Sequence, residues 1–214
     1  MASRGRGRPA AGDPATPSDG ELLDAALVAF ADRGFDGTSV RELARALDVS
    51  HNLIPQRFGS KDRLWYAAVD QGFGTLLSDL LPVVMEDRPD DIDRLRAWMV
   101  RFVEANAARP ALLRIINREA ASPGPRFDYL YDRYIEPVRA MGAAFLGDLH
   151  DRGLVTTDSV GLVYFLMTHG AGGPIAFPAL AERLDDAVRP DDPDAIRRHA
   201  EEAVAVLFEG LHRS

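Results

Sequence analysis

The sequence contains no cysteine, which excludes disulfide bonds and catalysis by a thiolate. It also lacks any continuous apolar run of roughly 18 residues, the length from which a membrane-spanning helix is suspected. Its N-terminal segment has no apolar stretch of about 7–15 residues and is therefore not a signal peptide. Together these absences predict a cytoplasmic protein that does not enter a membrane.

The motifs of common enzyme classes are missing as well. There is no Gly-x-Ser-x-Gly, no His-x₃-His pair and no dinucleotide-binding fingerprint, and the five histidines are scattered. A Gly-Ala-Gly-Gly run at residues 170–173 lacks the lysine and the preceding strand of a phosphate-binding loop. We therefore expect no catalysis, no cofactor and no metal site.

Lysine is nearly absent, since Lys61 stands alone against 24 arginines. The net charge of −8 is distributed unevenly along the chain. Residues 1–61 hold eight basic and eight acidic side chains, whereas residues 62–214 hold 17 basic and 25 acidic ones. Any nucleic-acid contact is therefore expected in the N-terminal part, with salt-sensitive binding that bulk charge does not drive.

Apolar residues recur at helical spacing along most of the 214 residues, which predicts an all-α fold. We expect a disordered basic arm at 1–19, a small helical domain at 20–66 and a larger one at 67–214. The predicted helices span residues 20–33, 61–81, 93–108, 110–121, 126–152 (bent at Pro137), 159–170 and 192–211. The 159–170 segment is apolar nearly throughout, which is typical of a helix buried on most sides.

Residues 38–61 are the most informative segment, because they predict two short helices joined by a tight turn. Ser39 and Glu42 fit a capping box, and Asp48 tolerates the sharp turn between the helices. Ser50 is the expected N-cap of the second helix. In DNA-binding domains such a pair inserts its second helix into the major groove, although an ordinary helical hairpin has the same spacing.

Residues 21–66 resemble the DNA-binding domain of the TetR family of bacterial transcriptional regulators. The matching positions are the apolar stripe 22–30, Arg33-Gly34-Phe35, Gly37-Thr38-Ser39, Glu42-Leu43-Ala44, Val49-Ser50 and Phe58-Gly59-Ser60-Lys61. The resemblance implies a homodimer of two-domain, all-α subunits. The N-terminal domain would bind a double-stranded DNA operator, and the C-terminal domain would bind a small, largely apolar molecule and dimerise.

Carried over by position, the resemblance assigns DNA contacts to nine residues. Thr38, Ser39 and Lys61 correspond to phosphate-contacting positions. The remaining six lie on the recognition helix, where Asn52 or Gln56 can pair with adenine and Arg57 can read guanine or hold a phosphate. They are Ser50, His51, Asn52, Leu53, Gln56 and Arg57. Plain surface exposure remains the alternative for each side chain.

Two positions depart from the family pattern, because Asn52 replaces a small residue and Pro55 replaces an aromatic one. A proline inside a regular helix costs about 3 kcal/mol. Either the first turn is wide or 3₁₀-like, or the regular helix begins nearer Asn52, which moves Pro55 into the tolerated first turn. We favour the second arrangement.

The N-terminal arm contains a basic run at residues 4–9, Arg-Gly-Arg-Gly-Arg-Pro. This run resembles an AT-hook, in which flexible arginines such as Arg6 and Arg8 enter a narrow A·T-rich minor groove. A solubilising tail is the alternative interpretation.

In the C-terminal part, the resemblance gives candidates for an effector pocket and a dimer interface. The pocket candidates are Trp98, Phe102, Arg118, Tyr134, Met141, Phe165 and His169. Aromatic and methionine side chains at helical spacing are also typical of plain core, whereas Arg118 and His169 are polar groups in apolar segments. His169 is alternatively a helix-end residue. The 159–170 and 192–211 helices suit a four-helix dimer interface, or else they complete a monomeric core.

The sequence thus predicts a ligand-responsive transcriptional repressor that releases a palindromic operator when a small molecule binds. The alternative, motivated by Pro55, is a helical ligand-binding or interaction protein that has lost sequence-specific DNA binding.

Overall fold

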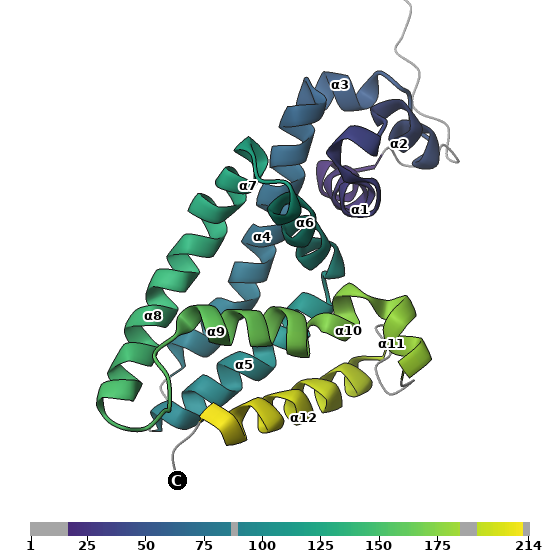
Figure 1. The fold of residues 1–214 in the computed structure, drawn as a ribbon. Helices are drawn as coiled ribbons and strands as arrows, with labels where there is room; N and C mark the ends of the chain where they lie inside the picture. Colours follow the sequence, from purple (N-terminus) through teal and green to yellow (C-terminus); the bar gives the residue numbers. More distant parts are fainter. Residues whose placement is uncertain (1–16, 87–89, 185–191, 212–214) are drawn as a thin grey trace, which may run out of the picture.

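The structure is a computed structural model that describes residues 17–86, 90–184 and 192–211. Every regular element in these ranges is helical, so the predicted all-α fold is confirmed (Figure 1). In chain order the elements are α1 (Asp19–Gly37), α2 (Val40–Ala46), α3 (Leu53–Phe58), α4 (Lys61–Met85), α5 (Asp91–Ala107), α6 (Pro110–Ala121), α7 (Pro125–Leu130), η1 (Tyr131–Ile135), α8 (Glu136–Asp151), α9 (Val160–Phe165), η2 (Leu166–Ala171), α10 (Gly173–Ala176), α11 (Pro178–Leu184) and α12 (Pro193–Leu211). The two η elements are π-helical.

Helices α1, α2 and α3 form a head at one end of the molecule (Figure 1). Helix α1 starts with a complete capping box: the Ser18 hydroxyl accepts from the Glu21 amide, and the Glu21 carboxylate accepts from the Ser18 amide at 2.8 Å. Near its other end α1 breaks at Gly34, where φ is 75° and ψ is 172°. Glycine adopts this conformation without a steric penalty, so the break occurs there.

The head has too few residues to bury its apolar side chains alone, and it shares a core with later helices. Leu22, Phe30 and Ile54 from the head pack in one cluster with Trp65 of α4 and Leu112 of α6, all at most 2% exposed. Leu130 and Tyr134, from α7 and η1, complete this cluster. A second cluster lies farther from the head and joins α5, α8, α9, η2, α10 and α12. Stability of the head therefore depends on the C-terminal helices.

Helix α4 belongs to both parts of the chain, because it begins beneath the head and continues to α5 (Figure 1). The predicted boundary between residues 66 and 67 falls inside this continuous helix. The predicted end at Leu81 is wrong, since α4 includes Pro82 and ends at Met85. Pro82 and Ser78 are both exposed, so water can satisfy the Ser78 carbonyl that loses its amide partner.

The long helix predicted at 126–152 is present but does not simply bend at Pro137. Its first part, α7, widens into the π-helical η1 immediately before the proline, and the amide of Glu136 donates to the carbonyl of Tyr131. Pro137 has no amide to donate to the carbonyl of Arg133. The helix accommodates that missing bond by inserting a π turn, as π-bulges typically do.

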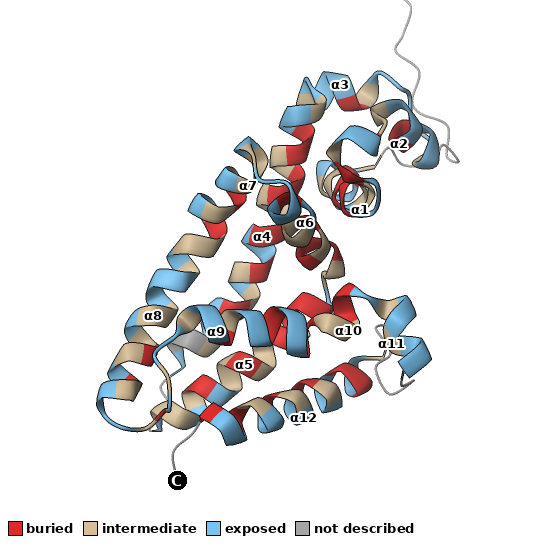
Figure 2. Cartoon of the chain, in the orientation of Figure 1, coloured by how far each residue is buried: buried red, intermediate tan, exposed pale blue. Residues whose placement is uncertain are grey.

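The helix predicted at 159–170 appears as α9 followed by η2, but it is not buried on most sides. Leu162, Phe165 and Leu166 are 50%, 62% and 41% exposed in the single chain, and α9 presents much of its outward face to solvent (Figure 2). The short helices α10 and α11 were not predicted. Helix α11 contains no buried residue at all.

Two glycines of α4 test the packing of α4 against α1 and α6. A Cβ atom at Gly72 would lie 2.8 Å from Leu27 and 2.9 Å from Leu112, whereas one at Gly74 would meet nothing within 4 Å. We expect Gly72→Ala to lower the free energy of unfolding by about 1–3 kcal/mol through overpacking. Gly74→Ala should raise it by about 0.5–1 kcal/mol, because alanine favours a helix.

Urea denaturation of both variants at one protein concentration measures the two effects. Equal stability of Gly72→Ala and Gly74→Ala would contradict the close approach of α1, α4 and α6.

Candidate nucleic-acid interface and its link to the C-terminal helices

Helix α2 is capped by Ser39, whose hydroxyl accepts from the Glu42 amide at 3.4 Å. The return half of the predicted capping box is not formed, because the Glu42 carboxylate pairs with Arg33 at 3.5 Å. Thr38, assigned to a DNA phosphate, is 2% exposed. Its hydroxyl lies 2.7 Å from the carbonyl oxygen of Gly34 and 3.1 Å from that of Ala29, so it joins the turn after α1 to the helix.

The turn between α2 and α3 has the geometry that its sequence predicts at Asp48. This residue has φ of 52°, a left-handed conformation that aspartate tolerates. The predicted N-cap is two residues too early: Ser50 precedes α3, and Asn52 occupies the N-cap position. Pro55 is consequently the third residue of α3, within the first turn, where a helix needs no amide donor. The favoured arrangement for Pro55 is thus the one found.

The side of α3 that faces away from α1 and α2 is open to solvent (Figure 2). His51, Asn52 and Gln56 are exposed on it, and Leu53 is half-buried. Ile54 is 2% exposed and anchors the opposite side of the helix in the shared core. One buried residue therefore fixes the rotation of α3 and leaves its polar side chains accessible.

Two cations beside this surface are held by the head itself. Arg57 donates to the carbonyl of Pro17 at 2.7 Å and pairs with Asp19 at 2.9 Å. The ammonium of Lys61 lies 4.6 Å from the ring centre of Phe35 and donates to the carbonyl of Asp36 at 3.3 Å. The Arg57 contact also places Pro17, just before α1, next to α3. Arg6 and Arg8 lie outside the described residues.

Arginines of α6 and α7 connect the C-terminal helices to the end of α1. Arg118 donates to the carbonyl of Asp32 at 3.1 Å, and Arg114 pairs with the Asp32 carboxylate at 2.9 Å. Arg126 of α7 lies 4.1 Å from the centre of the Phe35 ring and pairs with the buried Glu119. Carbonyls at a helix C-terminus attract cations, so these arginines stabilise the broken end of α1.

A second polar connection joins α4 to the π-helical segment around η1, and the sequence patterns did not predict it. One carboxylate oxygen of Asp70 accepts from both Tyr129, at 2.6 Å, and Tyr134, while Arg133 lies 3.5 Å from it. The Tyr134 ring also stacks on Phe73 of α4. Tyrosines five residues apart do not share a face of a regular α-helix, but the wider π turn brings them together. The close spacing of the tyrosines within residues 129–134 is the sequence feature that could have indicated this connection.

The structure brings some of the seven predicted effector residues together, such as Phe165 and His169 with ring centres 5.5 Å apart, but it does not gather all seven in one place. Trp98 and Phe102 stack on α5 with ring centres 5.4 Å apart, Tyr134 is buried against α4, and Arg118 contacts α1. Met141 and Phe165 are 49% and 62% exposed on α8 and α9. His169 is exposed on η2, with Nδ1 2.8 Å from the Thr168 hydroxyl.

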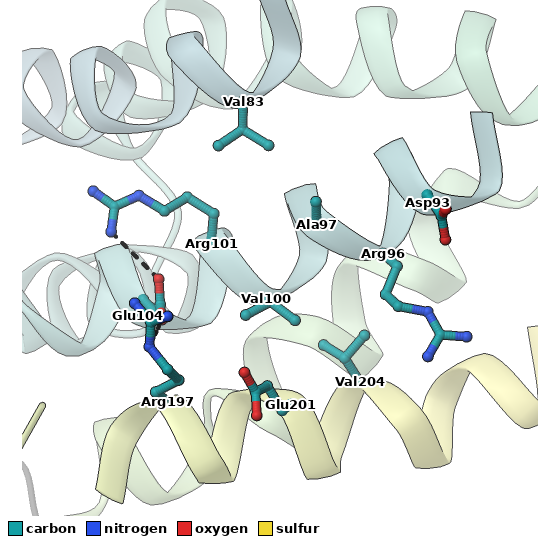
Figure 3. A pocket seen from close by; sticks show the side chains of 10 residues that line it. All are labelled: Val83, Asp93, Arg96, Ala97, Val100, Arg101, Glu104, Arg197, Glu201 and Val204. Atoms are coloured by element: carbon teal, nitrogen blue, oxygen red, sulfur yellow. Dashed lines mark hydrogen bonds and ion pairs between the residues drawn. The ribbon is translucent and has the colours of Figure 1, made fainter. Parts of the chain in front are cut away.

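A groove of about 640 Å³ lies elsewhere, between α5 and α12, and none of the predicted effector residues lines it (Figure 3). Its apolar lining comes from Val83, Ala97, Val100 and Val204. Charged side chains of both signs surround this lining, and Glu104 pairs with Arg101 at 3.4 Å and with Arg197 at 3.3 Å. The part of the chain that the structure describes contains no group of three or more histidine or acidic side chains placed to hold a metal ion.

Residues 22–68 match the family model of bacterial regulatory proteins of the tetR family. The match covers the head and the first turns of α4, and the likeness to this family applies to that part of the chain. Among its curated relatives is the HTH-type transcriptional repressor Rv3405c of Mycobacterium tuberculosis, 43% identical over 60 residues. That match covers 28% of this chain and 31% of Rv3405c, so the similarity spans about a third of the relative.

Longer matches involve two further mycobacterial regulators. The transcriptional repressor KstR2 of Mycobacterium tuberculosis is 29% identical over 119 residues, which cover 53% of this chain and 58% of KstR2. The transcriptional activator FasR of Mycolicibacterium smegmatis is 32% identical over 107 residues, which cover 47% and 48%. All three relatives are named as transcription regulators, not as enzymes.

Solved structures extend the likeness to nearly the whole chain at the level of the fold. The ketosteroid transcriptional regulator KstR2 superposes with a TM-score of 0.71 at 23% identity, covering 92% of this chain and 95% of KstR2. PfmR of Thermus thermophilus gives a TM-score of 0.60 at 21% identity, covering 93% and 100%. Within the described ranges of this chain, no helix has the length and apolar composition needed to cross a membrane.

The contact between Asp70 and Tyr134 leads to a prediction at alkaline pH. Burial and the hydrogen bond to Asp70 raise the pKa of Tyr134 to about 12 from its usual value of 10. A raised pKa in the folded state stabilises the protein below pH 10, and this contribution disappears as the pH rises from 10 through 12. Tyr134→Phe should therefore remove part of the loss of stability in this window.

Chemical denaturation at several pH values between 9 and about 12 measures the difference between the two proteins. An identical pH dependence of both would show that Tyr134 does not titrate through this contact.

Proposed function

We propose that this protein is a dimeric transcriptional repressor that binds a palindromic DNA operator and releases it when a small molecule binds the C-terminal helices. The observation that carries the proposal is the surface of α3. Its polar side chains His51, Asn52 and Gln56 are exposed on a short helix that follows a tight turn and is anchored by Ile54. This is the geometry in which a recognition helix presents its first turns to base edges.

Pro55 does not argue against DNA binding once its position is known. In the first turn of α3 it costs no hydrogen bond, and it leaves the exposed side of the helix unchanged. The rival interpretation, a regulator-like protein that has lost DNA binding, was motivated by a proline in the helix interior. That motivation is absent here, so operator binding is the better supported function.

Dimerisation is supported by the face formed by α9, η2 and α12. Leu162, Phe165 and Leu166 are exposed on it, and Val206 of α12 is 68% exposed. Val206 lies two helical turns after His199, whose ring contacts the carbonyl of Ala171 at 2.8 Å, so both residues are on the side of α12 toward η2. Covering this face with a second copy would remove a large apolar surface from water.

Effector control requires that the ligand favour one spacing of the two heads over another. The head is fixed to the C-terminal helices through α4 and through the contacts of Arg114, Arg118 and Arg126. A ligand that shifts α4, α6 or α7 would therefore move the head as well. A small, largely apolar molecule is the class of effector that the resemblance to the tetR family implies. KstR2 is named a ketosteroid regulator, and a sterol-like apolar compound is one member of that class to screen.

Substitutions on α3 test the proposed base contacts. Gln56→Ala and Arg57→Ala should each weaken binding to the DNA that flanks the protein's own gene by about tenfold or more, since a bidentate base contact contributes about 1–3 kcal/mol. Asp19→Ala is the matched control, because it removes the ion-pair partner of Arg57 and keeps the cation. Binding by this control should not decrease. Footprinting that detects no protected site at low salt, even for the unsubstituted protein, would overturn the proposal.

The basic arm has a separate test. Arg6→Ala combined with Arg8→Ala should weaken operator binding and make the plot of log affinity against log salt shallower by up to about two units, roughly one per lost phosphate contact. Gel shifts over a range of salt concentrations measure both quantities. An unchanged slope and affinity would identify the arm as a tail without a DNA role.

A further inference from the structure

Helix α11 and the residue before it carry an apolar stripe that the described part of the chain leaves largely exposed. Phe177, Leu180 and Leu184 are 55%, 58% and 78% exposed. Leu180 and Leu184 are four residues apart and share one face of α11, and Phe177 lies directly before the helix, where its carbonyl accepts from the amides of Leu180 and Ala181. No residue of α11 is buried, and a helix this short is not stable in water by itself. The stripe therefore needs a partner.

This stripe lies at one end of the α9–α12 face, and a second exposed apolar patch lies at the other end. Met141 of α8 is 49% exposed, and its neighbours Ala140 and Ala144 are also exposed. A Cβ atom at Gly142 would lie 3.3 Å from Val160, which places this patch beside the start of α9. Residues 160–171 separate the two patches by about 18 Å of helix.

The direction of the dyad decides which patches meet in a dimer. A palindromic operator requires a dyad that runs from the DNA through the dimer, that is, from the heads toward the opposite end of each subunit. In Figure 1 the head is at the top, while α9 and α12 run across the lower half of the molecule. If this two-fold axis is perpendicular to α9 and α12, these helices run in the opposite direction in the second copy.

The hydrogen bonds between α12 and its neighbours define the two ends of the face. His199, near the start of α12, contacts Ala171 at the end of η2, whereas Leu211 at the other end accepts from the amide of Thr156, just before α9. Helix α12 thus runs antiparallel to α9 and η2. The α11 end of one subunit accordingly meets the α8 end of its partner, twice per dimer.

We propose that α11 is a dimerisation arm whose stripe of Phe177, Leu180 and Leu184 packs on the Met141 patch of a second copy of this chain. The proposal rests on the proposed dimer and adds a contact outside its central helices. Both patches are apolar, each copy carries both, and a methionine side chain adapts readily to an aromatic or aliphatic neighbour. The contact buries the exposed stripe of α11 and the exposed Met141 together.

Introduced cysteines test the contact directly, because the natural sequence has none. We expect the double variant Leu180→Cys/Met141→Cys, treated with a short bis-maleimide, to form a covalent dimer on a reducing gel. Each single variant should remain mostly uncrosslinked. The same is expected of Leu180→Cys/Val28→Cys, in which the second cysteine replaces an exposed residue of the head that is 46% accessible. Cross-linking within one subunit is prevented by the separation of the two ends.

Sedimentation equilibrium of the unsubstituted protein separates failure of the arm from failure of the dimer. A dimer whose double variant does not cross-link beyond the Val28→Cys control would overturn the arm contact and leave the dimer standing. A monomer at every concentration would overturn both. As a second variant, Leu180→Ser/Leu184→Ser should raise the dimer dissociation constant about tenfold or more while retaining its helix content. An unchanged dissociation constant would also overturn the proposal.

Discussion

The packing of one small head on a single long helix is the constraint on which the remaining structure depends. The head supplies Leu22, Phe30 and Ile54 to a core that is completed by residues of α4, α5, α6, α7 and η1. Gly72 allows the close approach, because any side chain there would enter the space of Leu27 and Leu112. In the proposed function, DNA reading and ligand sensing therefore depend on one shared apolar core.

The polar contacts around this core have a common arrangement. Arg114, Arg118 and Arg126 bind the broken end of α1 and the neighbouring Phe35 ring, and Asp70 joins α4 to the two tyrosines of the π-helical region. Each contact crosses between elements that are distant in sequence. They are directional, unlike the apolar packing, so they favour one orientation of the head on the C-terminal helices.

Sequence patterns predicted the elements well and the side-chain environments less well. Periodicity located α6 to the residue, and the preference for an early helical proline led to the correct position of Pro55.

Rules based on neighbouring residues failed where a side chain makes a tertiary contact instead of a local one. Thr38 faces backbone carbonyls, and Glu42 prefers Arg33 to its own helix end. The π turn before Pro137, which brings Tyr129 and Tyr134 to one carboxylate, has no counterpart in 3.6-residue periodicity. Exposed Phe165 and Met141 have the same sequence signature as core residues, because both kinds of surface are apolar.

The lone lysine has a practical consequence. Amine-directed chemistry can reach only two kinds of site in this chain, the terminal α-amino group and the Nζ atom of Lys61. That atom lies over the Phe35 ring, at the junction of α1 and α4 beside the recognition helix. Once the terminal amine is blocked, an amine-reactive fluorophore or isotope label would therefore report on this junction alone. Enzymatic acylation of lysine, were it to act on the protein, would neutralise a charge at that one internal position.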